Sequence, residues 1–203
     1  MKYALFVFAA ALPLLAADGA MNPAERAFLL DQLESSKKEF LASIQGLTPA
    51  QWTFKAGPDR WSIQECAEHI ILAEDYIFGG TQRLLKVPAV ERPANSNLEV
   101  DKKLAAAVRD RSHKVSAPEA IVPGGKFATA EDAAKEFASR RAKTIEYAKT
   151  SNDDLRVHVG PGPVGPMDAY QGLILLAAHS SRHTAQILEV KASPNYPKSA
   201  SAE

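Results

Sequence analysis

Residues 167–191 read MDAYQGLILLAAHSSRHTAQILEVK, an apolar stretch that carries two histidines four positions apart. Apolar residues recur along it at spacings of three and four, which predicts an amphipathic helix from near Asp168 to Lys191. Residues four apart lie on one face of a helix, about one turn from each other. His179 and His183 can therefore reach a single metal ion from the same helix.

A third histidine, His69, lies in a second amphipathic helix about half a chain earlier. Ser62, with Glu65 three residues later, forms a capping-box pattern that predicts the start of that helix. Three protein ligands leave at least one coordination position open, which is typical of a catalytic rather than a structural metal site. The other histidines, His113 and His158, lie in stretches rich in proline, glycine and charge and are expected in solvated loops.

The hydrophobic periodicity predicts helices and no convincing strand, so we expect an all-α protein built as a four-helix bundle. Glycine pairs and prolines bound the helical segments and mark the connections between them. A connection of roughly 40 residues between the second and third helices is long enough to run the length of the bundle. It is expected to contain a short helix, and a Gly/Pro-rich loop is expected before the last helix. The four long helices are expected at 23–45, 62–79, 130–150 and 168–191, with a brief resumption of the second at 81–86 as an alternative to its ending at the Gly79–Gly80 pair. The short helix is expected at about 98–111 and the loop at 157–166.

Charge and cysteine content exclude several classes of function. The chain has 24 Lys and Arg against 24 Asp and Glu, so no overall field attracts nucleic acid or an anionic membrane surface. Its single cysteine, Cys66, cannot form an intramolecular disulfide or a cysteine-rich zinc site. We therefore expect a stable core held by packing, and no nucleic-acid partner.

The first 17 residues have the layout of a secretory signal peptide. A basic start precedes an apolar run, and small residues come just before Asp18. The run is shorter than the roughly 20 apolar residues that a membrane-spanning helix needs. The sequence therefore predicts export and cleavage near Ala17, with no membrane contact afterwards. The mature protein, periplasmic or secreted, is expected to be one domain at 18–197 with a disordered tail at 198–203.

Three further residues are candidates for the site, each with a structural alternative. Glu65, four residues before His69, is a candidate catalytic base or the acceptor that orients the His69 ring, but it is also the capping partner of Ser62. Cys66 is a candidate fourth ligand or nucleophile, or a small buried hydrophobic residue. Gln186 follows His183 by three residues and lines the same pocket or forms an interhelical hydrogen bond.

The sequence also carries three short segments: WSI at 61–63, EHI at 68–70 and HSSRHTAQI at 179–187. Together they resemble the DinB-like superfamily of metal-binding four-helix proteins, over a range from about 46 to 197. The resemblance implies an up-down-down-up bundle, a three-histidine site for a divalent metal such as zinc or nickel, and frequent dimers. Some similar proteins are thiol-dependent transferases or isomerases. The predicted export departs from the cytoplasmic members that use thiol chemistry.

Two functions follow from the sequence, and they belong to different classes. The first is a metal-dependent enzyme, a hydrolase or a thiol-dependent transferase, in which the ion activates a water or thiol toward a small molecule of unknown class. The second is a non-catalytic metal-binding or structural bundle. An accessible metal with an acid or base nearby favours the enzyme, whereas a ligand sphere closed by apolar side chains favours the structural protein.

Overall fold

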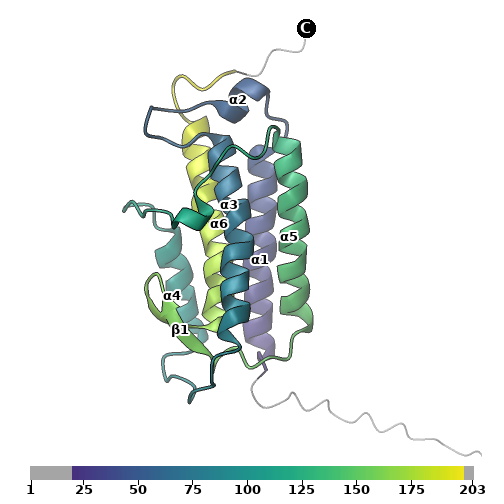
Figure 1. Cartoon of the computed structure of the whole chain (residues 1–203), viewed down its shortest axis with the longest axis vertical. Coiled ribbons are helices and arrows are strands. Elements are labelled where there is room, and N and C mark those ends of the chain that lie inside the picture. Colours follow the sequence, from purple (N-terminus) through teal and green to yellow (C-terminus); the bar gives the residue numbers. More distant parts are fainter. Residues whose placement is uncertain (1–19, 199–203) are drawn as a thin grey trace, which may run out of the picture.

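The computed structural model describes residues 20–198, which form a bundle of four long helices (Figure 1). The long helices are α1 (Pro23–Ile44), α3 (Ile63–Leu84), α5 (Ala130–Thr150) and α6 (Ala169–Lys191). Three short helical segments, α2 (Pro49–Thr53), α4 (Leu98–Arg109) and η1 (Glu119–Ile121), lie in the connections. The predicted all-α class and four-helix architecture are confirmed.

The four long helices run up, down, down and up (Figure 1). Arg26, near the start of α1, donates to the carbonyls of Ala148 and Lys149 at the end of α5, so these two helices are antiparallel. The Tyr170 hydroxyl, at the start of α6, donates to the Glu25 carbonyl, so α1 and α6 are parallel. Each of α1 and α3 packs against both α5 and α6. The predicted topology is therefore confirmed, and α3 and α6 are antiparallel neighbours.

Local capping chemistry explains where the helices begin. Helices α1, α2, α3 and α6 each start with a capping box, in which the cap side chain and a residue three positions later satisfy each other's backbone N–H groups. Ser62 and Glu65 form the box predicted for α3. Helix α1 ends before Gly46, whose φ of 68° is a left-handed conformation that favours glycine.

One predicted helix end and one predicted loop differ from the structure. Helix α3 does not end at Gly79 and Gly80 but continues to Leu84, because Ile77, Phe78 and Leu84 pack against the core and offset the cost of interior glycines. The predicted loop at 157–166 is instead part of an antiparallel hairpin.

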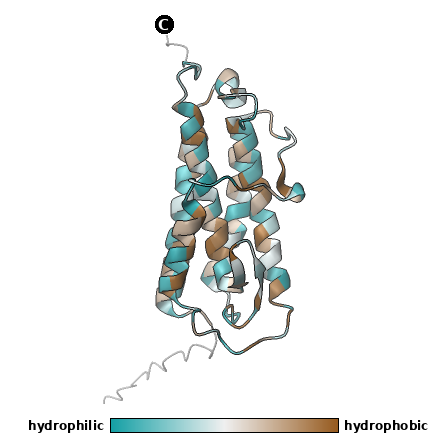
Figure 2. Ribbon diagram, turned by 90° about the vertical axis from the view of Figure 1, so that its left-hand side faces the viewer, coloured by the Kyte–Doolittle hydropathy of each residue, from teal (hydrophilic) through white to brown (hydrophobic). Residues whose placement is uncertain are grey.

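The hairpin consists of β1 (Val159–Gly162) and β2 (Gly165–Asp168). Its strands lack the alternating apolar pattern that signals a strand. Pairing holds because Gly165 takes a φ of 113° at the turn, and because a Cβ on Gly162 would collide with the side chain of Met167. Figure 2 views the molecule from the side where this hairpin lies and shows hydrophilic and hydrophobic residues alternating along the helices.

Two arginines are buried in the bundle and bind the helices together through ion pairs. Arg141 on α5 donates from Nε to Glu74 on α3 at 2.9 Å and also donates to Ser36 and Ser180. Such a group is tolerated in a core only when each of its donors has a partner. It therefore fixes α1, α3, α5 and α6 at one level of the bundle.

The second buried arginine, Arg156, lies near the opposite end from α2 and binds three carboxylates. It pairs with Glu25, Asp101 and Asp168, at 2.9, 2.7 and 3.1 Å. Its guanidinium also lies 3.8 Å from the ring centre of Tyr170. This cluster fixes α4 and the hairpin against the start of α1 and α6.

The predicted signal peptide, residues 1–17, lies outside the described residues, and so does the predicted tail from residue 199 onward. Within 20–198, no helix combines the length and the apolar character needed to cross a membrane.

Candidate metal centre

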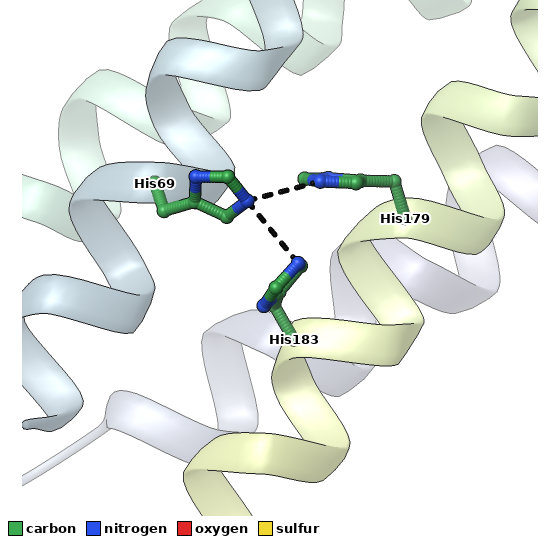
Figure 3. A group of neighbouring side chains, drawn as sticks. All are labelled: His69, His179 and His183. Atoms are coloured by element: carbon green, nitrogen blue, oxygen red, sulfur yellow. Dashed lines mark hydrogen bonds between the residues drawn. The ribbon is translucent and has the colours of Figure 1, made fainter. Parts of the chain in front are cut away.

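The three predicted ligands meet between α3 and α6. His69 projects from α3, His179 and His183 project from α6, and the three rings point toward one another (Figure 3). The Nε2 atom of His69 lies 3.1 Å from Nε2 of His179 and 3.1 Å from Nε2 of His183. One nitrogen from each ring lies within 4.8 Å of the other two. The structure thus brings together a cluster that could hold a metal ion.

The close packing of α3 and α6 makes this meeting possible. At Gly172 the two helices approach so closely that an added Cβ would lie 2.6 Å from Oγ1 of Thr81 on α3. His179 and His183 lie further along α6, one turn apart, so both face the same helix.

The proton on the His69 ring is fixed by the backbone. Nδ1 of His69 lies 2.7 Å from the carbonyl oxygen of Ile121, in η1. A carbonyl can only accept a hydrogen bond, so Nδ1 must be the donor. A neutral imidazole carries one ring proton, so Nε2 keeps its lone pair and directs it at the other two histidines.

The His183 ring is fixed in the same sense by a side chain. Nδ1 of His183 donates to Oε1 of Gln186 at 2.9 Å. Oε1 also accepts from Nη1 of Arg111 at 3.3 Å, and an arginine can only donate. His179 differs, because its buried Nδ1 has no hydrogen-bond partner among residues 20–198.

Burial keeps all three rings uncharged near neutral pH. Burial lowers the pKa of His69, lowers the pKa of His183 to about 3, and sets the pKa of His179 well below its usual value. The neighbouring imidazoles lower the pKa of His179 and His183 further. The cluster is therefore a group of neutral nitrogen donors rather than a cationic patch.

A buried carboxylate that sequence reasoning missed holds the loop above the cluster. The carboxylate of Glu68 accepts from the backbone N–H groups of Gly124, Gly125 and Lys126, at 2.9, 2.7 and 2.9 Å. This fastens to α3 the segment that also supplies the Ile121 carbonyl. The signal that could have found it is an acidic residue on the buried face of α3, combined with the glycine pair in the connection.

Trp61, which immediately precedes the N-cap Ser62 of α3, forms one side of the site. Its ring centre lies 4.9 Å from that of His69 and 6.1 Å from that of His183. His69 is buried, whereas His179 and His183 are partly exposed. The cluster is therefore walled by an aromatic ring on one side and reaches solvent on the side of α6.

The carboxylate of Glu65 is engaged away from the cluster. Its oxygens accept from the backbone N–H of Ser62 and from Nζ of Lys55, both at 2.7 Å. The acceptor that orients the His69 ring is Ile121, so the predicted orienting role of Glu65 is wrong. Its role as a catalytic base stays a prediction.

Cys66 is fully buried, and burial raises the pKa of its thiol to about 12. Within residues 20–198, the group of converging ligand atoms contains the three histidines and not this sulfur. The structure therefore favours the interpretation of Cys66 as a small hydrophobic residue. Gln186, by contrast, lines the site through its bond to His183.

Comparison with known proteins settles the family. The model of the DinB superfamily matches residues 32–187, which include all three histidines. The chain belongs to the DinB superfamily. It is also 25% identical over 150 residues to the uncharacterized protein YuaE of Bacillus subtilis (strain 168), a match that covers 73% of this chain and 88% of YuaE. No solved structure matches the chain.

The low pKa values predict how this DinB-superfamily protein responds to acid when it is free of metal. Unfolded histidines titrate near 6.5, above their folded values, so below about pH 6.5 the unfolded chain binds protons that the folded chain does not. The free energy of unfolding should fall from pH 7.5 to 5.5, by up to about 1.4 kcal/mol per pH unit for each histidine. Urea denaturation with a chelator present measures this. The double variant His179→Gln, His183→Gln should show a shallower fall, and an equal slope in both proteins would contradict the assignment.

Proposed function

We propose that this protein is an exported metal-dependent enzyme that binds one divalent ion through Nε2 of His69, His179 and His183. The observation that carries the proposal is the convergence of three uncharged nitrogens at the interface of α3 and α6. Two of these nitrogens have their lone pairs fixed by partners that accept from the opposite side of the ring. Lone pairs that face one another repel, and a cation between them removes that repulsion.

The spacing of the nitrogens fits such an ion. Nitrogens at about 2.0–2.1 Å from a tetrahedral zinc ion lie about 3.3–3.4 Å from each other. The observed separations of 3.1 Å are close to this value. Imidazole suits several divalent metals, and we propose zinc or nickel because of the family resemblance.

Three protein ligands leave a position for water or substrate, as catalytic metal sites do. A divalent ion held there would supply a Lewis acid that polarises a substrate or lowers the pKa of a water or a thiol. The chain's own residues would shield the ion and orient its ligands. Trp61 shields one side of the site, and Ile121 and Gln186 hold two rings in the required orientation. A small molecule would approach from the side of α6, where His179 and His183 are partly exposed. The reaction would be a hydrolysis or a thiol-dependent transfer.

One observation favours the alternative, a non-catalytic metal-binding protein. The carboxylates nearest in sequence to His69 both have other partners: Glu65 binds Ser62 and Lys55, and Glu68 binds three backbone N–H groups. A general base must reach the proton that it removes. If neither carboxylate can move, the ion itself must supply the nucleophile without help from an acidic side chain.

The proposal includes export and the partners that follow from it. Residues 1–17 would direct the protein to the periplasm or outside the cell, and the mature chain would act there on a small molecule, away from nucleic acid and membrane, as a homodimer. N-terminal sequencing of protein from the native host should give a chain that begins near Asp18. A cytoplasmic chain that begins at Met1 would overturn this part.

Metal content tests the site directly. We expect about one divalent ion per chain in purified protein, measured by elemental analysis, and loss of that ion in the double variant His179→Ala, His183→Ala, because one remaining ligand makes a poor site. His113→Ala is the matched control, since His113 is an exposed histidine outside the cluster. Full occupancy in the double variant would refute the site.

Cobalt substitution separates an open site from a closed one. A thiol should bind to the cobalt protein as thiolate and add a near-ultraviolet charge-transfer band, because three neutral ligands leave the ion its full charge. The band should saturate with added small thiol and should persist in Cys66→Ser, since Cys66 is buried and outside the cluster. A band present before thiol is added, and lost in Cys66→Ser, would show that Cys66 closes the site.

A further inference from the structure

We infer that Arg111 positions the metal ligand His183 by setting the orientation of the Gln186 side-chain amide. Arg111 touches neither histidine nor substrate, so it is a positioning residue that acts through Gln186. The inference rests on the proposed metal site, because its consequence is the availability of Nε2 of His183 as a ligand.

The side-chain amide of Gln186 can face Nδ1 of His183 in either of two orientations, which differ by a half turn of the amide. Turned one way, it presents Oε1 to Nδ1 of His183 and requires a proton there, which leaves the lone pair on Nε2. Turned the other way, it presents an NH2 group, so Nδ1 must accept and the proton moves to Nε2. A ring protonated on Nε2 cannot bind the ion from that atom.

Arg111 removes this ambiguity. Its Nη1 lies 3.3 Å from Oε1 of Gln186, the same oxygen that accepts from His183. A guanidinium has donors only, so a flipped amide would set NH2 against N–H at this point. The oxygen is therefore held between two donors, and the proton of the imidazole stays on Nδ1.

The position of Arg111 is itself fixed by α6. Its Nε and Nη2 donate to the two carboxylate oxygens of Glu189 at 2.6 and 2.8 Å, a bidentate pair. Arg182, also on α6, donates to the carbonyls of Val108 and His113 on either side of Arg111. The guanidinium is thus held rigidly enough to select one orientation of the amide.

The contrast with His69 explains why a third residue is needed to orient the hydrogen-bond partner of His183. The partner of His69 is the carbonyl of Ile121, which can only accept and leaves no choice of tautomer. His183 is oriented by a side chain that can turn over, and only a third group can decide which way it faces.

The inference is tested by measuring how Arg111→Met changes zinc affinity in two proteins, the wild type and the Gln186→Glu variant. Arg111→Met should weaken zinc binding about 10- to 100-fold, the usual effect of losing a group that orients a metal ligand. Arg60→Met is the matched control, because Arg60 also pairs with Glu189, at 3.5 Å, but has no bond to Gln186. In the Gln186→Glu background both ends of the side chain are oxygens, so Arg111→Met should weaken zinc binding much less. An equal loss in the two backgrounds would overturn the inference and make Arg111 a structural residue.

Nitrogen-15 NMR of labelled histidines in the metal-free protein gives a second readout that does not depend on metal binding. The wild-type His183 ring should carry its proton on Nδ1, and Arg111→Met should shift it toward the Nε2-protonated form. No change of tautomer in Arg111→Met would refute the inference even if zinc binds. A wild-type protein that binds no metal, with the tautomer shift present, would instead refute the proposed function alone.

Discussion

Three imidazole rings are packed together between α3 and α6, and other contacts of the fold must offset the cost of this arrangement. Nε2 of His69 lies 3.1 Å from Nε2 of each of the other two histidines, and the fixed lone pairs of His69 and His183 repel each other. Burial also lowers the pKa of the rings and so prevents them from becoming cations that attract water. The fold must hold them there by other contacts. The Glu74–Arg141 pair serves this purpose, because it ties α3 to α5, and its bond to Ser180 ties both to α6 next to His179.

The connection between α3 and α5 contributes to the site at two places. After α4, Arg111 bonds Gln186, which in turn bonds His183. At η1, the Ile121 carbonyl accepts from His69, and Glu68 anchors the following glycines. A segment that crosses the bundle for topological reasons thus also fixes the protons of two candidate ligands.

Local patterns in the sequence predict much of this molecule. The i, i+4 histidines, the Ser62 capping box and the apolar periodicity act within one helix, so the helices and all three candidate ligands could be identified. The hairpin, the partner of Glu68 and the role of Arg111 could not, because each depends on chain segments that meet only in the folded protein. Glu65 shows the converse, since its carboxylate forms the local capping bond to Ser62, while Ile121 and not Glu65 orients the His69 ring.

X-ray absorption spectroscopy of the metal-loaded protein would show whether the three histidines bind the ion, because it reports the atoms around the metal. For zinc, we expect about three nitrogen scatterers at about 2.0–2.1 Å with the outer-shell pattern of imidazole, and no sulfur. A sulfur scatterer at about 2.3 Å, or a first shell without imidazole, would contradict it.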